Sequence, residues 1–249
     1  MKITAAISTY NRLPSLKEAI NSVKSQTFLP CELIIVDDNS TDGTKEYCEN
    51  LQLNIPLIYL RNDKNLGAAL SRNRAIEKAD GDYIAFLDDD DEWLPEKLQE
   101  QKKIAEKGFD LIYTAVVTQK SDKVYFHKRF PVFFGNFAGI TSTFMINVGV
   151  LRKLGGFDAE LPALQDYDLV IRLVKAGVKV KGIKLPLVKY LPSDDKNISN
   201  SSKKFFSASK IILSKTSLRA KPLQFVGLLR IFVQKFMKSG EFRKDFLSN

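Results

Sequence analysis

Four consecutive carboxylates, Asp88 to Asp91, directly follow the apolar run 83–87. If that run is a buried strand, the four charges repel one another at its end and lose hydration, which raises their free energy. A divalent cation is the simplest compensation, because carboxylate oxygens suit hard ions such as Mg²⁺ and Mn²⁺, whose coordination a substrate's phosphates can complete. The alternative is a solvated acidic turn that caps the helix expected after Pro95.

A second acidic pair, Asp37 and Asp38, follows the apolar run 33–36. Adjacent carboxylates at a strand end need a ligand, a cation or hydrogen-bond donors to offset their repulsion, so we expect at least one of them to bind something. The polar residues 40–42 precede Gly43 and are predicted to be ordinary turn and helix-capping residues.

The elements that position these carboxylates are readable from the alternation of short apolar runs with helical patterns. This alternation predicts a parallel sheet covered by helices. The predicted strands are residues 3–8, 32–36, 57–60, 83–87 and 110–113, and the predicted helices are residues 15–25, 66–79, 147–154 and 166–176. Ligands gather at the carboxyl ends of parallel strands, so the polar residues after the first, second and fourth strands are expected to share one site.

Four motifs stand in order along the chain. They are Ile-Ser-Thr-Tyr-Asn-Arg at 7–12, Val-Asp-Asp-Asn-Ser-Thr-Asp-Gly-Thr at 36–44, Asn-Leu-Gly with Ser-Arg-Asn at 65–73, and Gly-Asp-Tyr-Ile-Ala-Phe-Leu followed by the four aspartates at 81–91. With them the chain resembles the family 2 glycosyltransferases from residue 3 to about residue 191, of the type that builds bacterial cell-surface polysaccharide or lipopolysaccharide. The resemblance implies a GT-A fold, which is a Rossmann-like, mostly parallel sheet flanked by helices. It also implies inverting, metal-dependent transfer of a sugar from a nucleotide-sugar donor, expected to be a UDP-sugar, to a hydroxyl of a glycan or lipid-linked acceptor.

The same resemblance implies roles for five residues around the donor. Tyr10 would stack on the nucleotide base, Asp38 would hydrogen-bond that base, and Ser8 would line the same pocket. Arg72 would face the nucleotide, with a plain surface charge as the alternative. Trp93 would lie near the bound sugar, with an ordinary core position as the alternative.

Within the acidic run, the resemblance implies a graded set of roles. Asp90 would be the direct ligand of Mn²⁺ or Mg²⁺, Asp89 would lie near the ribose or the diphosphate, and Asp88 would be a weaker donor contact. Asp91 could do no more than cap the next helix.

A fifth motif, Gly-Gly-Phe-Asp at 155–158 with Gln-Asp-Tyr-Asp at 165–168, supplies a candidate general base. The family commonly has Glu-Asp here; Gln165 replaces the glutamate, while Asp166 keeps the position that resembles the base. On local sequence alone, Asp166 is equally suited to cap the following helix. Inverting transfer needs a base for the acceptor hydroxyl, and the only histidine, His127, falls in an aromatic and basic stretch that we expect to be a loop.

The basic charge of the chain lies almost entirely at its C-terminal end. The formal net charge is +9, and residues 196–249 hold 12 Lys and Arg against two Asp and Glu, so the rest carries −1. We expect a catalytic domain at 1–192, then a linker and a basic amphipathic tail at 193–249. A helix between Pro222 and Lys238 would place six apolar side chains on one face: Phe225, Leu228, Leu229, Phe232, Val233 and Phe236. The opposite, polar face would carry Gln224, Arg230, Gln234, Lys235 and Lys238. This face is expected either to contact an anionic membrane surface or to dock on the enzyme.

Composition excludes several other classes of protein. Cys31 and Cys48 form neither a disulfide framework nor a metal-ligand spacing, and no signal peptide or run of 18 apolar residues is present. From these features we expect a cytoplasmic protein, either soluble or peripheral on the inner face of the cell membrane. A nucleic-acid binder is disfavoured because the basic charge is confined to the tail, and a phosphoryl-transfer domain because the first strand ends in Ser-Thr-Tyr rather than an aspartate. The alternative function is a catalytically inactive nucleotide-sugar-binding or scaffolding subunit.

Overall fold

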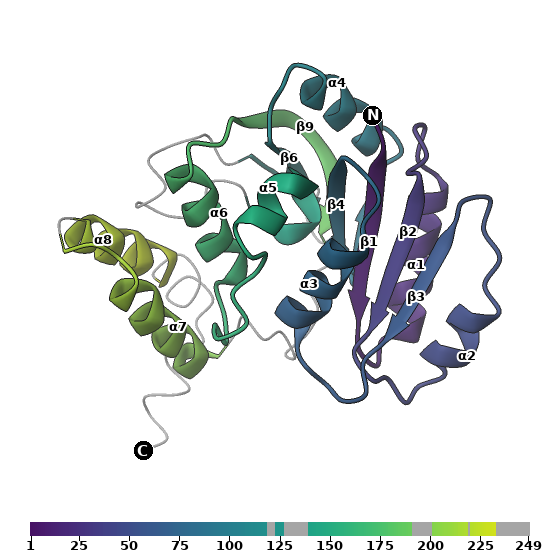
Figure 1. Ribbon diagram of the computed structural model, residues 1–249, viewed down its shortest axis with the longest axis horizontal. Coiled ribbons are helices and arrows are strands. Elements are labelled where there is room, and N and C mark those ends of the chain that lie inside the picture. Colours follow the sequence, from purple (N-terminus) through teal and green to yellow (C-terminus); the bar gives the residue numbers. More distant parts are fainter. Residues whose placement is uncertain (119–122, 127–138, 191–200, 219, 233–249) are drawn as a thin grey trace.

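The computed structural model describes residues 1–118, 123–126, 139–190, 201–218 and 220–232. Its centre is one sheet in the order β3-β2-β1-β4-β8-β6-β9-β5, with β7 paired to β6, and helices cover both faces (Figure 1). The strands are β1 (Ile3–Thr9), β2 (Glu32–Asp37), β3 (Leu57–Arg61), β4 (Tyr83–Asp88), β5 (Asp91–Trp93), β6 (Leu111–Thr118), β7 (Val124–Tyr125), β8 (Met145–Asn147) and β9 (Val180–Tyr190). The five strands expected from the sequence all form.

The half of the sheet that carries the acidic motifs is parallel. Strand β1 lies between β2 and β4, and β3 flanks β2, all in parallel register. The three-residue strand β8 then pairs antiparallel with both β4 and β6, and β9 runs parallel to β6 before its end pairs with β5. The mixed second half therefore returns the chain to the acidic turn, because β5 begins at Asp91.

Two apolar clusters pack on the two faces of this sheet, as strand alternation requires. One contains Ala6, Ile34, Ile84 and Phe86 and includes residues of α3 (Ala68–Lys78), α5 (Val148–Lys153) and α6 (Gln165–Lys175). The other contains alternate residues of the same strands and includes residues of α1 (Leu13–Lys24), α2 (Thr44–Glu49) and α4 (Lys97–Ala105). Because both clusters pack against the parallel strands, the carboxyl ends of these strands are held in fixed positions.

Local chain chemistry sets the ends of the helices near the site. Asn147 caps α5 by accepting a hydrogen bond from Val150 N at 3.0 Å. The helix ends at Lys153, and Gly155 and Gly156, with φ of +75° and +67°, follow its C-cap residue and turn the chain away. At Gly156 a Cβ would meet Asn73 Oδ1 at 2.3 Å, so this position requires glycine for close approach to α3.

The tail forms two helices, α7 (Ser202–Ser214) and α8 (Lys221–Phe232), which lie together on the α6 side of the molecule (Figure 1). The expected single apolar face of α8 is wrong in part. Leu228 and Phe232 are buried, whereas Phe225 and Leu229 are exposed, and Gln224 of the expected polar face is fully buried. The docking of α8 decides which side is covered, and helical periodicity alone could not show this.

Several expectations concern residues outside the described part of the chain. These are residues 127–135 of the loop expected at 125–135, residues 193–200 of the linker expected at 193–202, and the continuation of the last helix through Val233 and Phe236. Tyr125, at the start of the expected loop, instead lies in β7. None of the helices in the described ranges is long and apolar enough to cross a membrane.

Candidate active site

The acidic residues meet at the carboxyl ends of three adjacent strands. Strand register pairs Ser8 of β1 with Asp88 of β4, and Thr9 of β1 with Asp37 of β2. Asp89 and Asp90 form the turn between β4 and β5, and Asp38 directly follows β2. The structure thus brings Ser8, the second-strand aspartates and the acidic run to one edge of the sheet.

Arg12 lies over the acidic turn. Its Nη1 donates to Asp89 Oδ1 at 3.0 Å and to Asp90 Oδ2 at 2.7 Å, and Thr9 Oγ1 donates to Asp89 Oδ2 at 2.7 Å. Burial raises the pKa of Asp89 to about 6, although the charge of Arg12 and the Thr9 hydroxyl oppose this shift. Burial, with the nearby charge of Asp88, also raises the pKa of Asp90. The turn is therefore a place where a cation is held, and in this structure the cation is a guanidinium.

Asp88 has a separate cationic partner. Arg72 of α3 donates from Nη2 to Asp88 Oδ1 at 2.5 Å, and its guanidinium carbon lies 5.4 Å from the centre of the Phe157 ring. Only 12% of the Arg72 side chain is exposed, so the alternative of a plain surface charge does not describe it. Arg72 instead connects the acidic turn to the segment that leads into α6.

Ser142 holds both ends of the acidic run. Asp88 N donates to Ser142 Oγ at 3.0 Å, and Ser142 Oγ donates to Asp91 Oδ2 at 2.5 Å. Trp93 Nε1 donates to the Ser142 carbonyl at 3.0 Å, and the Trp93 ring is only 2% exposed. The expected sugar contact of Trp93 is untested, but this ring has almost no free surface and its visible role is to support the turn. Asp91 is buried against Ser142 rather than placed to cap a helix.

Asp37 and Asp38 have different surroundings. Asp37 is fully buried and accepts from Arg61 Nη1 at 2.6 Å, from the Tyr59 hydroxyl at 2.7 Å and from Ser40 N at 2.8 Å. These partners give it a structural role.

Asp38 accepts from Asn62 Nδ2 at 2.6 Å and from the backbone amides of Leu66 and Gly67 at 2.7 Å each. These donors compensate its charge and fix its direction. Tyr10, the expected base-stacking residue, exposes 45% of its surface just after β1. Its ring is therefore available to a flat ligand.

Three consecutive residues on α3 connect the parts of the site. Ser71 Oγ accepts from the Asn62 amide that also binds Asp38, and Arg72 pairs with Asp88. Asn73 donates to Phe157 O at 2.8 Å and accepts from Phe157 N at 2.7 Å. One turn of helix thus fixes the position of the Asp38 pocket, the acidic turn and the segment before α6 relative to one another.

Asp166 lies in the first turn of α6 and is half-buried. The helix begins at Gln165, and the preceding residue, Leu164, has a left-handed φ of 61°, a conformation that is costly for a residue other than glycine. The N-cap expectation for Asp166 is therefore wrong, since Leu164 occupies the cap. Gln165 Nε2 donates to Leu161 O at 2.9 Å, so the residue in the usual glutamate position supports the turn.

Residues 4–155 match the family model described as "Glycosyl transferase family 2". The chain belongs to glycosyl transferase family 2. This glycosyltransferase is 33% identical over 213 residues to an uncharacterized glycosyltransferase of Methanocaldococcus jannaschii, with 79% of this chain and 73% of the relative aligned. It is also 33% identical over 121 residues to the GalNAc(5)-diNAcBac-PP-undecaprenol beta-1,3-glucosyltransferase of Campylobacter jejuni, with 48% of this chain and 39% of that protein aligned.

Solved structures establish the fold of this family 2 glycosyltransferase. A crystal structure of S. aureus TarS in complex with UDP-GlcNAc matches with a TM-score of 0.78, covering 95% of this chain and 74% of that one at 19% identity. The mannosyltransferase PcManGT from Pyrobaculum calidifontis, in complex with GDP-Man and Mn²⁺, matches with a TM-score of 0.65, covering 91% and 69% at 18% identity. The expected GT-A fold is confirmed.

The acidic turn of the glycosyltransferase fits a metal ion whose ligands come partly from the protein and partly from a substrate. The described residues contain no group of three or more His, Cys, Asp or Glu side chains that could hold an ion unaided. Asp88 is paired with Arg72, whereas Asp90 is 20% exposed and pairs with Arg12, whose own side chain is 33% exposed. A cation here would take a carboxylate oxygen from Asp90 and its other ligands from phosphate or water, which is the usual arrangement for Mg²⁺.

Several residues of this site were given no individual role from the sequence: Arg12, Arg61, Asn62 and Asn73. Asn62 follows the third strand, so the rule used for the other strand ends would have found it. Arg12 and Asn73 lie inside the recognised motifs. The hydroxyl-rich segment 139–143 has a composition that stands out in the sequence, but the contacts of its Ser142 with Asp88 and Asp91 span more than fifty residues of chain.

The raised pKa of Asp89 predicts a gain in stability when its charge is removed. A carboxyl with a pKa of about 6 in the folded state binds more protons than in the unfolded state, so the free energy of unfolding falls as pH rises from about 4 to about 6. Asp89→Asn imitates the protonated form and should raise the free energy of unfolding by about 2 kcal/mol at pH 7.5 in EDTA. Urea denaturation measures the free energy of unfolding of both proteins. The gain in stability of Asp89→Asn should vanish near pH 4. A variant less stable than wild type at pH 7.5 would contradict the raised pKa of Asp89.

Proposed function

We propose that this family 2 glycosyltransferase is an inverting, metal-dependent enzyme that moves a sugar from a UDP-linked donor to a hydroxyl of a glycan or lipid-linked acceptor. The observation that carries the proposal is the strand register that sets Ser8 beside Asp88 and Thr9 beside Asp37. This register supports the proposal because Asp38, the proposed base-binding carboxylate that follows Asp37, then lies on the same sheet edge as the acidic turn proposed to bind the cation. A nucleoside diphosphate needs both features a short distance apart.

The nucleotide is expected to lie across the ends of β1 and β2. Asp38 is held by three donors, and an ionised carboxylate has capacity for about four, so it can still accept the N3–H of uracil. The exposed ring of Tyr10 would stack on the base, and half-buried Ser8 would line the pocket. The TarS structure with UDP-GlcNAc supports a uridine donor by analogy.

The diphosphate is expected to lie over the acidic turn. Asp90 would hold Mn²⁺ or Mg²⁺ with the donor's phosphates, and the complex of PcManGT with GDP-Man and Mn²⁺ supports this choice by analogy. A bound cation would stabilise the negative charge that grows on the leaving diphosphate. Asp89 would keep Thr9 and Arg12 in place beside the ribose or diphosphate, and Arg72 would hold Asp88.

Asp166 is the proposed general base. Its oxygen would take the proton of the acceptor hydroxyl as that hydroxyl attacks the anomeric carbon from the side opposite the diphosphate, which inverts the configuration. The strained cap at Leu164 and the Asn73–Phe157 hydrogen bonds keep the start of α6 fixed relative to α3. A fixed base avoids the loss of rate that follows from small misplacement.

The acceptor class is inferred from relatives. The Campylobacter jejuni relative is named as a glucosyltransferase acting on an undecaprenol-linked diphosphate glycan, and we carry that acceptor class over to this chain. A cytoplasmic setting is proposed with it, which suits the two free thiols of Cys31 and Cys48.

A panel of nucleotide sugars tests the donor proposal. In Mn²⁺, UDP-sugars should raise the melting temperature of the protein more than GDP-mannose or dTDP-glucose, and one UDP-sugar should be slowly hydrolysed. EDTA should remove most of the shift. Equal shifts with all bases, or shifts that persist in EDTA, would contradict the proposal. Binding without any hydrolysis or transfer to a lipid-linked glycan would favour the inactive, nucleotide-sugar-binding alternative.

A further inference from the structure

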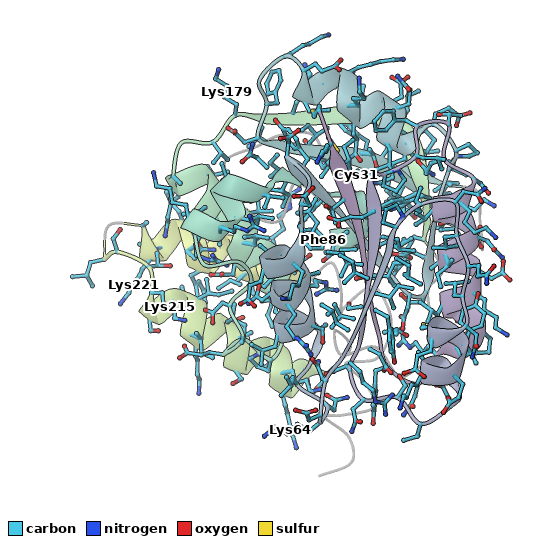
Figure 2. All side chains as sticks on the ribbon, turned by 45° about the vertical axis from the view of Figure 1, so that its right-hand side comes forward. Cys31, Lys64, Phe86, Lys179, Lys215 and Lys221 are labelled. Carbon is cyan, nitrogen blue, oxygen red and sulfur yellow. The ribbon has the colours of Figure 1, made fainter. Side chains whose placement is uncertain are left out.

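The α7–α8 hairpin (residues 201–232) is strongly basic. In sequence it carries seven Lys and Arg and no Asp or Glu: Lys203, Lys204, Lys210, Lys215, Arg219, Lys221 and Arg230. Figure 2 shows Lys215 and Lys221 on this hairpin at one side of the molecule, well away from Phe86 in the middle of the sheet. A surface of one sign attracts a partner of the opposite sign.

The inner face of the hairpin is fixed to the catalytic domain. Gln224 Nε2 of α8 donates to the Tyr167 hydroxyl of α6 at 2.6 Å, with both side chains buried. Lys215 donates to Asp158 Oδ2 at 2.6 Å and to Glu160 Oε2 at 3.0 Å. Leu228 and Phe232 are also buried. Apolar, polar and ionic contacts together therefore dock the hairpin on the catalytic domain. Its outer face is the side of α8 that faces away from these contacts.

That outer face is apolar. Four side chains of α8, spaced so that they share one side of the helix, are each about half exposed: Leu223 (45%), Phe225 (57%), Val226 (48%) and Leu229 (50%). Leu218, just before α8, is 82% exposed. Exposed Arg230 lies at the edge of this arc and Lys221 begins the helix. Isolated exposed apolar residues are normal on proteins, but a contiguous row on a helix that is already docked indicates a binding surface.

We propose that the outer face of α8, formed by Leu223, Phe225, Val226 and Leu229, contacts the surface of an anionic lipid bilayer. The apolar row would enter the boundary between headgroups and acyl chains, and Lys221 and Arg230 of the same helix would meet lipid phosphates. Charge selects this occupant, because the hairpin has no acidic residue to repel an anionic surface or to pair with a basic one.

The contact has a consequence for the reaction, and this step rests on the proposed function. Tyr167, which receives the hydrogen bond from Gln224, directly follows the candidate base Asp166 on α6. A bilayer bound by α8 is thereby held in a fixed orientation to the start of α6. An acceptor anchored in the same bilayer would then reach the site from a defined direction.

Vesicle flotation tests the contact. The full chain should float with phosphatidylcholine vesicles containing 30% phosphatidylglycerol at least about tenfold more than with pure phosphatidylcholine. Phe225→Ser with Leu229→Ser should lower the bound fraction on anionic vesicles by at least about tenfold. Leu185→Ser on β9, where the leucine is 51% exposed, is the matched control and should float like wild type.

Three results would overturn the membrane contact. They are failure of the wild type to float, equal flotation on neutral and anionic vesicles, and a double variant that floats as well as wild type. If the wild type instead stays unbound and forms an oligomer that the double variant dissociates, the face is an interface between copies of this chain. UDP-sugar thermal shifts on the same variants check folding and separate this outcome from failure of the proposed function, since neither substitution touches the sheet edge that would bind the donor.

Discussion

Replacement of Asp166 by asparagine should lower kcat by about 10³-fold and leave donor affinity within about twofold of wild type. The amide keeps the size and polarity of the carboxylate but cannot accept the acceptor's proton. Asp166 stands in the first turn of α6, whereas the donor groups are expected at the ends of β1, β2 and β4, so the two functions lie on different elements. The measurement is steady-state turnover with the donor found in the nucleotide-sugar panel, together with calorimetric titration of that donor.

The control for Asp166 is Glu77→Gln, which removes an exposed carboxylate from the far end of α3. It should retain wild-type kcat. If Asp166→Asn lost less than about tenfold in kcat, another group would have to be the base. The neighbour Gln165 is a poor candidate, because it has no ionisable group and its amide is used by Leu161.

Replacement of Asp90 by asparagine should weaken Mn²⁺-dependent donor binding by about 100-fold and lower turnover by at least about 10³-fold. A neutral amide oxygen is a poor ligand for a hard divalent ion compared with a carboxylate. Asp90 is a suitable ligand because it lies on the turn and is 20% exposed, beside a partner, Arg12, that is itself 33% exposed. Calorimetric titration of the donor with Mn²⁺ and with EDTA measures the effect.

The expected pattern for Asp90→Asn is specific to metal. Its donor affinity should be the same in Mn²⁺ and in EDTA, and close to that of wild type in EDTA. The control Asp80→Asn removes a carboxylate at the other end of β4, where Asp80 pairs with Lys2 in solvent, and should keep full Mn²⁺ dependence. A variant at Asp90 that still gained affinity from Mn²⁺ would place the ion elsewhere.

The sequence predicted the parallel half of the sheet well because β1, β2 and β4 each contain a run of five or more buried residues, and β3 is a half-buried apolar run beside them. It missed the 11-residue β9, and also β5, β7 and β8, which have two or three residues each. Such short strands carry no periodic signal of their own. Because these strands were not predicted, the sequence also did not show that the pairing of β5 with β9 brings Trp93 and Asp91 into the core.

The candidate site could be predicted as a set of strand ends, but its internal partners could not. Asp37 and Asp38 are adjacent, and nothing in the local sequence distinguishes their roles. The structure shows that Asp37 accepts hydrogen bonds from Arg61 and Tyr59, whereas Asp38 accepts them from the backbone amides of Leu66 and Gly67. Likewise, an acidic run suggests a cation without saying that Arg12 serves as one. Charge compensation is a property of three-dimensional neighbours, and a one-dimensional pattern states only that compensation is required.

The tail also shows that a sequence pattern does not identify packing partners. Helical periodicity found a helix with apolar residues, but docking on α6 divided those residues between a buried set and an exposed set. Gln224 was expected in solvent and is buried, because its partner Tyr167 lies 57 residues away.

If the acidic turn binds metal and donor while α6 supplies the base, substitutions at the two places must affect donor binding differently. Donor affinity is measured by calorimetry in Mn²⁺ and in EDTA for wild type, Asp90→Asn and Asp166→Asn under identical conditions. We expect Mn²⁺ to strengthen binding about 100-fold in wild type and in Asp166→Asn but not in Asp90→Asn. Loss of Mn²⁺-dependent binding to the same extent in both variants would contradict this division of roles.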